Sequence, residues 1–105
     1  MAALMQLEEL TINAIQLKKG AMIIRAINHP LRQQILSLIH QEGRITVTQL
    51  YIRLRLEQSV VSQHLAILRK SGFVETQREG KFIYYKVDQD RLAYVQNCCV
   101  SLLTF

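Results

Sequence analysis

The spacing of apolar residues changes twice along this chain, and the two changes limit what it can fold into. Up to Ser71, apolar residues recur every three or four positions, which is the period of a helix. Residues 73–78 and 81–87 are instead rich in β-branched and aromatic residues, and Glu79-Gly80 between them suits a tight turn. The helical period returns at Asp88. The sequence therefore predicts a mainly α fold with one β-hairpin, in the order α-α-α-α-β-β-α.

Local signals predict where the first four helices begin and end. The first 28 residues are expected to form one long helix, because its apolar seam repeats with heptad spacing. Pro30 suits the first turn of a second helix over 30–42, which ends near Gly43. Thr46 suits the N-cap of a short third helix. The fourth helix is expected over about 58–71, with its end at Gly72.

The chain of 105 residues is long enough for one domain, 1–105, and half of its residues are hydrophobic. Its two cysteines, Cys98 and Cys99, are adjacent, which excludes a disulfide framework and a Cys-rich zinc finger. The N-terminus lacks the basic start and apolar run of a signal peptide, and no segment has the roughly 18 consecutive apolar residues of a membrane span. We therefore expect a cytoplasmic protein with no membrane partner.

The net charge of +5 is concentrated in one part of the sequence. Residues 44–86 hold eight basic and three acidic residues, whereas the segments before and after nearly balance. A basic helix-turn-helix followed by a β-ribbon suits a reader of duplex DNA, because phosphates supply much of the affinity and a helix fits the major groove. The alternative is that the basic charge serves solubility alone.

The fourth helix has one polar and one apolar side. Val61, Leu65 and Leu68 are expected to face the core. The other side begins with residues that can contact bases or phosphates, namely Gln58, Ser59, Ser62, Gln63 and His64. Arg69 and Lys70, near the far end of the helix, are weaker candidates for phosphate contacts. The alternative interpretation is an ordinary solvated helix face.

Three motifs follow one another along the chain. They are Asn28-His29-Pro30-Leu31-Arg32-Gln33-Gln34-Ile35-Leu36, Ser59-Val60-Val61-Ser62-Gln63-His64-Leu65 and Arg78-Glu79-Gly80-Lys81-Phe82-Ile83-Tyr84-Tyr85. In this order, over about residues 20–90, they resemble the ArsR/SmtB family of bacterial winged-helix repressors. The resemblance implies a homodimeric transcription factor that binds operator DNA, with a helix-turn-helix at 45–71 and a wing at 73–87. We expect Arg78 and Lys81 to touch the DNA backbone from the wing.

The first and last helices, 1–28 and 88–105, carry more apolar surface than one small core can cover. A two-fold pair of chains would bury both helices. The expected interface residues are Leu7, Leu10, Ala14, Leu17, Leu92, Val95, Cys99 and Leu102. The alternative is that both helices wrap the core of their own chain.

The resembled family usually releases DNA when a metal ion or an oxidant binds. One family site is a Cys-x-Cys on the third helix, where this chain has Gln49-Leu50-Tyr51-Ile52-Arg53. A second family site, on the last helix, retains only carboxylates here, since Ser101 and Thr104 stand where later ligands would fall. We therefore expect no metal and no cofactor, and the effector is unidentified.

Two further interpretations stay open. Cys98 and Cys99 are either part of an apolar seam or, across a dimer, a redox or soft-metal sensor. The chain could also be a winged-helix module that binds a protein and has lost DNA binding, because Glu57 at the start of the fourth helix would repel phosphate. An enzyme is not expected, because the three histidines are scattered and no nucleophile has a base at a suitable spacing.

Overall fold

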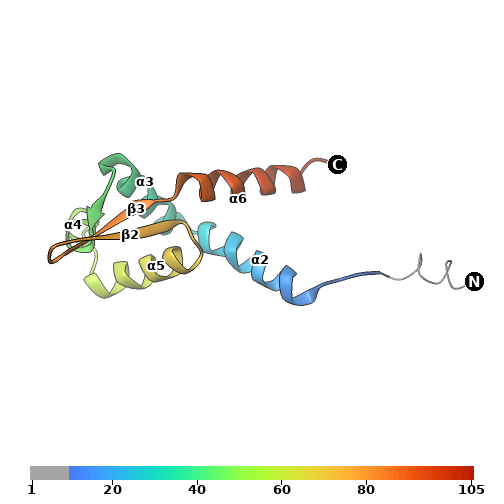
Figure 1. The fold of residues 1–105 in the computed structure, drawn as a ribbon, viewed down its shortest axis with the longest axis horizontal. Helices are drawn as coiled ribbons and strands as arrows, with labels where there is room; N and C mark the ends of the chain where they lie inside the picture. The colour runs from blue at the N-terminus through green and yellow to red at the C-terminus, as the bar shows by residue number, and fades with distance from the viewer. Residues whose placement is uncertain (1–9) are drawn as a thin grey trace, which may run out of the picture.

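A computed structural model of the protein describes residues 10–105. Within this range it contains five helices and three strands (Figure 1). In chain order these are α2 (Ala14–Ile27), α3 (Pro30–Glu42), β1 (Ile45–Thr46), α4 (Val47–Leu54), α5 (Gln58–Lys70), β2 (Val74–Glu79), β3 (Phe82–Val87) and α6 (Gln89–Leu102). The predicted fold class, mainly helical with a hairpin before the last helix, is confirmed.

The first predicted helix is too long at its start. Residues 10–13 are not helical, and α2 begins at Ala14. The side-chain oxygen of Asn13 accepts a hydrogen bond from the backbone N–H of Gln16 at 3.0 Å, so Asn13 is the N-cap of α2. The prediction missed this cap because the apolar repeat continues through Leu10, ahead of Asn13. The part of the prediction that covers residues 1–9 lies outside the described residues.

The other helix ends agree with the predictions from local sequence. His29 caps α3 through its imidazole, and Pro30 is the first helical residue. Thr46 and Gln49 form a reciprocal capping box at the start of α4. The side chain of Asp88 caps α6. These side chains satisfy backbone N–H groups that have no partner inside the helix.

The sheet has the strand order β1-β3-β2, and every pairing is antiparallel. In the hairpin Glu79 pairs with Phe82, so the two-residue turn is Gly80-Lys81 and not the predicted Glu79-Gly80. Gly80 has a φ of +63°, which a residue without a Cβ adopts readily. Strand β1 was not predicted, because two residues are too few to show a period.

The core lies where α3, α4 and α5 pack on one another and on the hairpin. Its fully buried side chains are Ile35, Ile39, Ile45, Leu50, Val61, Leu65, Leu68 and Phe73. Phe73 lies at the joint between α5 and the sheet: its N–H donates to the carbonyl of Leu68 and its carbonyl accepts from the N–H of Asp88, both at 2.9 Å. These two bonds connect the end of α5 to the start of α6 through Phe73.

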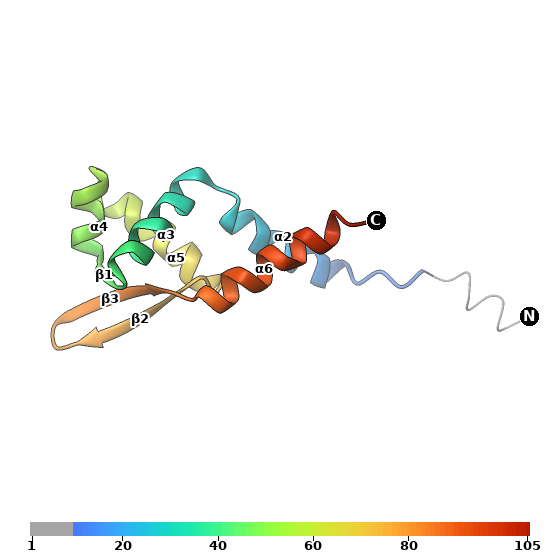
Figure 2. The same ribbon diagram turned by 90° about the horizontal axis from the view of Figure 1, so that it is seen from above.

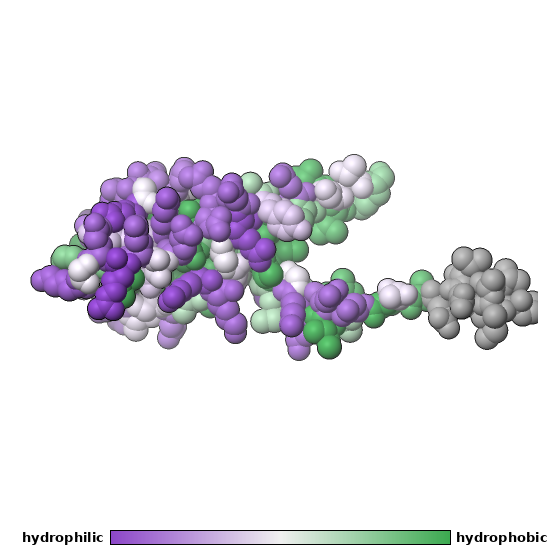
Figure 3. Space-filling model, viewed as in Figure 1, coloured by the Kyte–Doolittle hydropathy of each residue, from purple (hydrophilic) through white to green (hydrophobic). Residues whose placement is uncertain are grey.

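The N-terminal part of α2 and most of α6 extend away from this body in the same direction (Figures 1 and 2). Residues 10–22 are all exposed, and only the last turns of α2 pack against the core. Val95 of α6 is buried in the core, whereas residues 100–105 are exposed. These two segments, α2 and α6, are called the arms below. In the space-filling view, green apolar surface is visible on both of them beside hydrophilic surface (Figure 3).

Candidate nucleic-acid interface

Helix α5 separates its core side chains from its polar side chains cleanly. Val61, Leu65 and Leu68 are buried. On the opposite side Gln58, Ser59, Ser62 and Gln63 are exposed, at positions i, i+1, i+4 and i+5 of one face. The 13 residues of α5 span about 20 Å, long enough to lie in a major groove. This face, Gln58–Gln63, is called the reading face below.

His64 follows the reading face in sequence but is held by the body. It is half-buried, and its Nδ1 accepts a hydrogen bond from Nε of Arg32 on α3 at 3.1 Å. Its ring lies 5.0 Å from that of His29. The guanidinium of Arg32 also donates to the carbonyl of Ala26 at 3.2 Å, so it connects α2, α3 and α5. His64 therefore supports the position of α5, and its predicted DNA contact stays a prediction.

Burial lowers the pKa of His64, and the positive charge of Arg32 and the neighbouring His29 add to this effect. The neutral form, which accepts the hydrogen bond from Arg32, is therefore favoured in the folded protein. In the unfolded chain the imidazole takes up a proton already near pH 6.5. The unfolded state thus binds more protons between pH 6.5 and the lowered pKa, and stability falls as pH decreases through that window.

We accordingly expect acid sensitivity that depends on His64. The urea midpoint of the parent protein should fall more between pH 7.5 and 5.5 than that of His64→Gln, measured at constant ionic strength. His40→Gln, at an exposed histidine of α3, serves as the control. Equal falls in the parent and in His64→Gln would contradict this role for the imidazole.

The wing presents exposed basic and apolar side chains at its tip. Arg78 donates from Nε to the carbonyl of Gly80 at 3.3 Å, and Lys81 stands in the turn itself. Nζ of Lys81 lies 5.4 Å from the ring centre of Phe82, which is 50% exposed. The tip of the wing, α4 and the start of α5 all lie at the end of the molecule away from the arms (Figures 1 and 2). Figure 3 shows this end as mostly hydrophilic.

Two of the eight basic residues in 44–86 are neutralised locally. Arg44 pairs with Glu79 at the wing and lies 4.1 Å over the ring of Tyr84, and Arg53 pairs with Glu42. Among residues 10–105 no ion pair involves the other six, which are Arg55, Arg69, Lys70, Arg78, Lys81 and Lys86. Six of the eight basic residues are therefore available to an anionic partner, and they are spread over the α4–α5 turn, α5 and the hairpin.

The turn between α4 and α5 contains a residue, Arg55, that was not among the predicted DNA-contacting residues. Arg55 has a φ of +56° and ends α4 in the left-handed conformation. This conformation costs a residue with a Cβ about 1–2 kcal/mol. The exposed guanidinium stands in the short connection that leads into α5. Its signal in the sequence was weak, because no Gly or Asn marks the turn.

Glu57 occupies the N-cap position of α5 but makes no capping hydrogen bond through its side chain. The first N–H groups of α5 thus have no acceptor from a capping side chain, and such groups are suited to bind a phosphate oxygen. Its carboxylate is nonetheless exposed beside them.

The other predicted functional residues lie away from this interface. Cys98 is exposed and Cys99 is half-buried on α6; both are free thiols, and the thiol hypothesis stays a prediction. Within residues 10–105 no three potential ligand residues come together as a metal site. No helix in the same range is long and apolar enough to cross a membrane.

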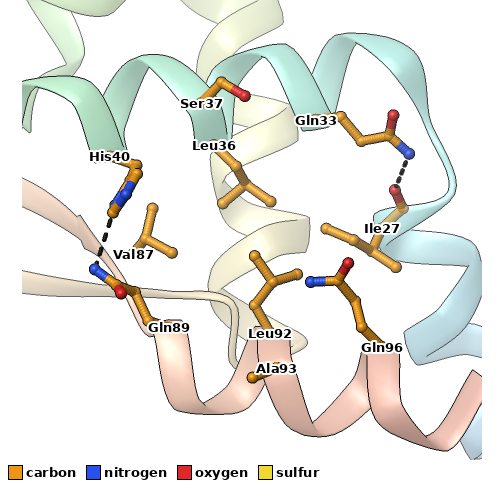
Figure 4. Close-up of a pocket in the computed structure, with 10 residues that line it drawn as sticks. All are labelled: Ile27, Gln33, Leu36, Ser37, His40, Val87, Gln89, Leu92, Ala93 and Gln96. Carbon is orange, nitrogen blue, oxygen red and sulfur yellow. Dashed lines mark hydrogen bonds between the residues drawn. The ribbon is translucent and has the colours of Figure 1, made fainter.

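A pocket of about 380 Å³ lies between α3 and α6, on the side of the arms (Figure 4). Leu36, Val87 and Leu92 point into it, and no Lys, Arg, Asp or Glu lines it. Nδ1 of His40 lies 3.3 Å from Nε2 of Gln89. Gln33 donates from Nε2 to the carbonyl of Ile27 at 2.9 Å. These polar contacts help to hold α6 and the end of α2 on the body.

Comparison with known proteins matches this arrangement to DNA-binding regulators. Residues 29–76, from the N-cap of α3 into β2, match the model of the bacterial regulatory protein, arsR family. An HTH-type transcriptional regulator of Methanocaldococcus jannaschii is 35% identical over 71% of this chain and 84% of its own length. The transcriptional activator HlyU of Vibrio cholerae is 36% identical over 77% of this chain and 71% of its own length.

Solved structures of regulators share most of this arrangement. The transcriptional repressor PagR of Bacillus anthracis superposes with a TM-score of 0.64 at 28% identity, covering 82% of this chain and 99% of its own. The match covers more of the chain than residues 29–76, which the family model recognises. The order of elements, the exposed polar face of α5 and these similarities together show that the chain belongs to the ArsR family of helix-turn-helix transcriptional regulators.

Proposed function

We propose that the protein is a homodimeric, sequence-specific DNA-binding repressor of the ArsR type that lacks the usual metal sites. The reading face of α5 contacts base edges in the major groove, and Arg78 and Lys81 hold the wing against the backbone. In this division 45–71 is the helix-turn-helix and 73–87 is the wing. The arms α2 and α6 form the dimer interface.

The observation that carries the proposal is the composition of the reading face. Four exposed amide and hydroxyl side chains stand on α5 opposite three buried apolar ones. Gln can make two hydrogen bonds with adenine, and Ser adapts to several base edges. The basic wing lies at the same end of the body (Figure 2). A duplex that meets the reading face therefore also meets the cations that fix its register.

Dimerisation is supported by the apolar side chains that the arms expose. Ile15 and Leu17 on α2 are 67% and 65% exposed, and Val100 and Leu102 on α6 are 62% and 65% exposed. A soluble chain rarely leaves so much apolar surface uncovered. A two-fold pair would cover the arms and present two α5 helices to successive turns of the DNA. Leu92 and Val95, by contrast, pack in the core of their own chain, and Leu7 lies outside the described residues.

Repression is inferred from the manner of binding. A small dimer that occupies an operator can exclude other proteins from it without a further contact. The related PagR is a repressor and the related HlyU is an activator. Whether this protein represses or activates is therefore tested by expression of a reporter gene from the controlled promoter, with and without the protein. Higher expression from the controlled promoter without the protein is the expected result.

Gln63→Ala tests base reading directly. Against an operator selected from random duplexes by the parent protein, we expect a loss of roughly 5- to 150-fold, which corresponds to the 1–3 kcal/mol of one good base contact. Binding to random duplex should change little. The matched control is Gln41→Ala, at an exposed glutamine of α3 far along the chain from α5. Equal losses on operator and random DNA would remove Gln63 from base reading.

Lys81→Ala tests the wing. A phosphate contact contributes to every sequence alike, so affinity for operator and random duplex should fall by a similar factor. The slope of log K against log salt should become shallower by about one unit. Thr48→Ala, at an exposed uncharged residue of α4, is the control. If the slope of log K against log salt is unchanged in Lys81→Ala, Lys81 does not contact the DNA backbone.

The exposed carboxylate of Glu57 favours one alternative, a winged-helix module that binds a protein instead of DNA. Salt dependence on random duplex separates the two functions. A DNA reader should lose affinity with a log–log slope of several units between low and moderate salt. A protein module should bind the duplex weakly or not at all, whatever the salt concentration.

A further inference from the structure

A groove of about 650 Å³ runs between α2 and the C-terminal end of α5. The proposed function places α2 in the dimer interface but gives the groove itself no ligand. Its floor is apolar: Met22, Ile23 and Ala26 contribute from α2, and Ile67 contributes from α5. Met22 is 51% exposed and Ile67 is 38% exposed, although both sit between two packed helices. The volume lies within the range of pockets that hold small molecules.

All the charged residues that line the groove are basic, and Ser71 is its one uncharged polar residue. Lys19 and Arg25 stand on α2, Arg32 on α3 and Lys70 on α5, and no lining residue is acidic. Within residues 10–105, the two lysines and Arg25 form no ion pair. Four cations around an uncharged floor repel one another unless an anion lies among them.

Arg32 is already positioned for such an anion. Its Nε donates to His64 and its Nη1 donates to the carbonyl of Ala26, at 3.1 and 3.2 Å. A guanidinium has five N–H donors, so three remain for a ligand. Because the planar group is fixed from the body side, little rotamer entropy is left to lose when it binds a carboxylate.

The two sides of the groove are continuous helix faces. Lys19, Met22, Ile23 and Ala26 follow the i, i+3, i+4, i+7 spacing of one face of α2. Ile67 and Lys70 of α5, and Ser71 at its C-cap, follow the i, i+3, i+4 part of this spacing. Each helix thus contributes apolar side chains and one ammonium group to the lining, which is the complement of a molecule with an apolar chain and one anionic end.

We propose that this groove binds a small amphipathic anion, with one carboxylate or a similar head and an apolar body of roughly eight to twelve carbons. Duplex DNA does not fit the same lining, because phosphates gain nothing from an apolar floor. The α2 arm of a second copy fits less well, because α2 itself carries Lys18, Lys19 and Arg25 and would be repelled by the rim. The α6 arm of a second copy, which has no basic residue after Arg91, is the rival occupant that the dimerisation measurement below tests.

The position of the groove gives the ligand a regulatory consequence, which rests on the proposed function. The ligand would touch α2, an arm of the proposed dimer, and α5, the proposed reading helix. Its binding would therefore favour one angle between arm and reading helix, and would change operator affinity by its preference for that angle.

The test uses decanoate, below its micelle concentration, with the full chain in titration calorimetry without DNA. We expect saturable binding with one site per chain, weaker binding of uncharged decanamide by roughly tenfold or more, and none of acetate. Lys19→Gln/Lys70→Gln should lower the affinity for decanoate by roughly tenfold or more. Lys18→Gln/Arg69→Gln removes the same charge from neighbouring positions that do not line the groove and should retain binding.

The apolar floor has its own pair of variants. Ile67→Asn should weaken decanoate binding without a change in charge, whereas Ile52→Asn, at an exposed isoleucine of α4, should not. Urea midpoints establish that all variants are folded. Equal affinity of both double variants for decanoate would overturn the site, as would binding to anionic vesicles but not to monomeric decanoate. A change in dimerisation alone in Lys19→Gln/Lys70→Gln would assign the groove to a protein interface and would also overturn it.

The DNA readout separates this inference from the proposed function. Decanoate should shift operator affinity in the parent and in Lys18→Gln/Arg69→Gln, relative to each protein without ligand, but not in Lys19→Gln/Lys70→Gln. Intact operator binding by a protein that does not bind decanoate overturns the ligand site alone. Decanoate binding by a protein with no affinity for any duplex overturns the proposed function alone.

Discussion

Replacing Leu17 and Leu102 by glutamate is expected to turn the proposed dimer into monomers and to remove operator binding at concentrations where the parent protein binds fully. Both leucines are 65% exposed in the single chain, one on each arm. Sedimentation equilibrium gives the first result, and titration of the selected operator gives the second. This is the largest effect expected of any surface substitution in the molecule.

The size follows from the apolar area that the pairing would bury. Each dimer contains four of these leucines, and burying the exposed part of each contributes about 1 kcal/mol or more. Their loss alone weakens association by roughly 4 kcal/mol, close to a thousandfold. Four glutamates placed in the same seam add the cost of removing charges from water. A monomer then meets the operator with one reading face instead of two.

The chain offers a matched control for this experiment. Gln16→Glu/Ser101→Glu adds the same charge one residue away on each arm, at exposed polar positions. It should remain dimeric and bind the operator. If Leu17→Glu/Leu102→Glu stays dimeric, the arms do not form the interface. That result would favour the alternative in which both helices pack on the core of their own chain. Equal dissociation in both double variants would point to charge alone as the cause.

Much of the fold was predictable because the residues that begin and end its helices are recognisable from the local sequence. Pro30 and Gly43 mark the two ends of α3, and Thr46 with Gln49 marks the start of α4 within four residues. The start of α2 was not predictable in the same way. Leu10 continues the apolar spacing, so the spacing predicts a helix through residue 10. The helix instead begins after its N-cap, Asn13. The start of a helix is decided by the capping side chain where the two signals disagree, because the cap gives a hydrogen-bond acceptor to backbone N–H groups that have no partner inside the helix.

The candidate site divides along the same line. The reading face could be predicted, because the spacing of Val61, Leu65 and Leu68 fixes which side of α5 is free. The inward turn of His64 could not, because it depends on Arg32, which is 32 residues away in sequence. Val95 shows the same limit on α6. Its spacing fitted an external seam, but contacts with the body bury it.

The placement of α5 depends most on Phe73, and Phe73→Ala is expected to lower the free energy of unfolding by about 3–5 kcal/mol. Phe73 is fully buried and is the largest such side chain within the described residues. Its backbone joins the end of α5 to the start of α6, so a cavity there loosens the reading helix and an arm together. For a chain of this size we expect a fall in Tm of more than about 10 °C.

Phe82→Ala makes the same substitution on the half-exposed phenylalanine of the wing and should cost about 1 kcal/mol or less. The comparison separates the loss of an aromatic ring from the loss of the joint. Urea unfolding with both variants measures it, and hydrogen exchange of the α5 amides shows where the loss falls. If the two variants are equally stable, the hairpin and α5 are held by the remaining core, and the position of the reading helix does not depend on this ring.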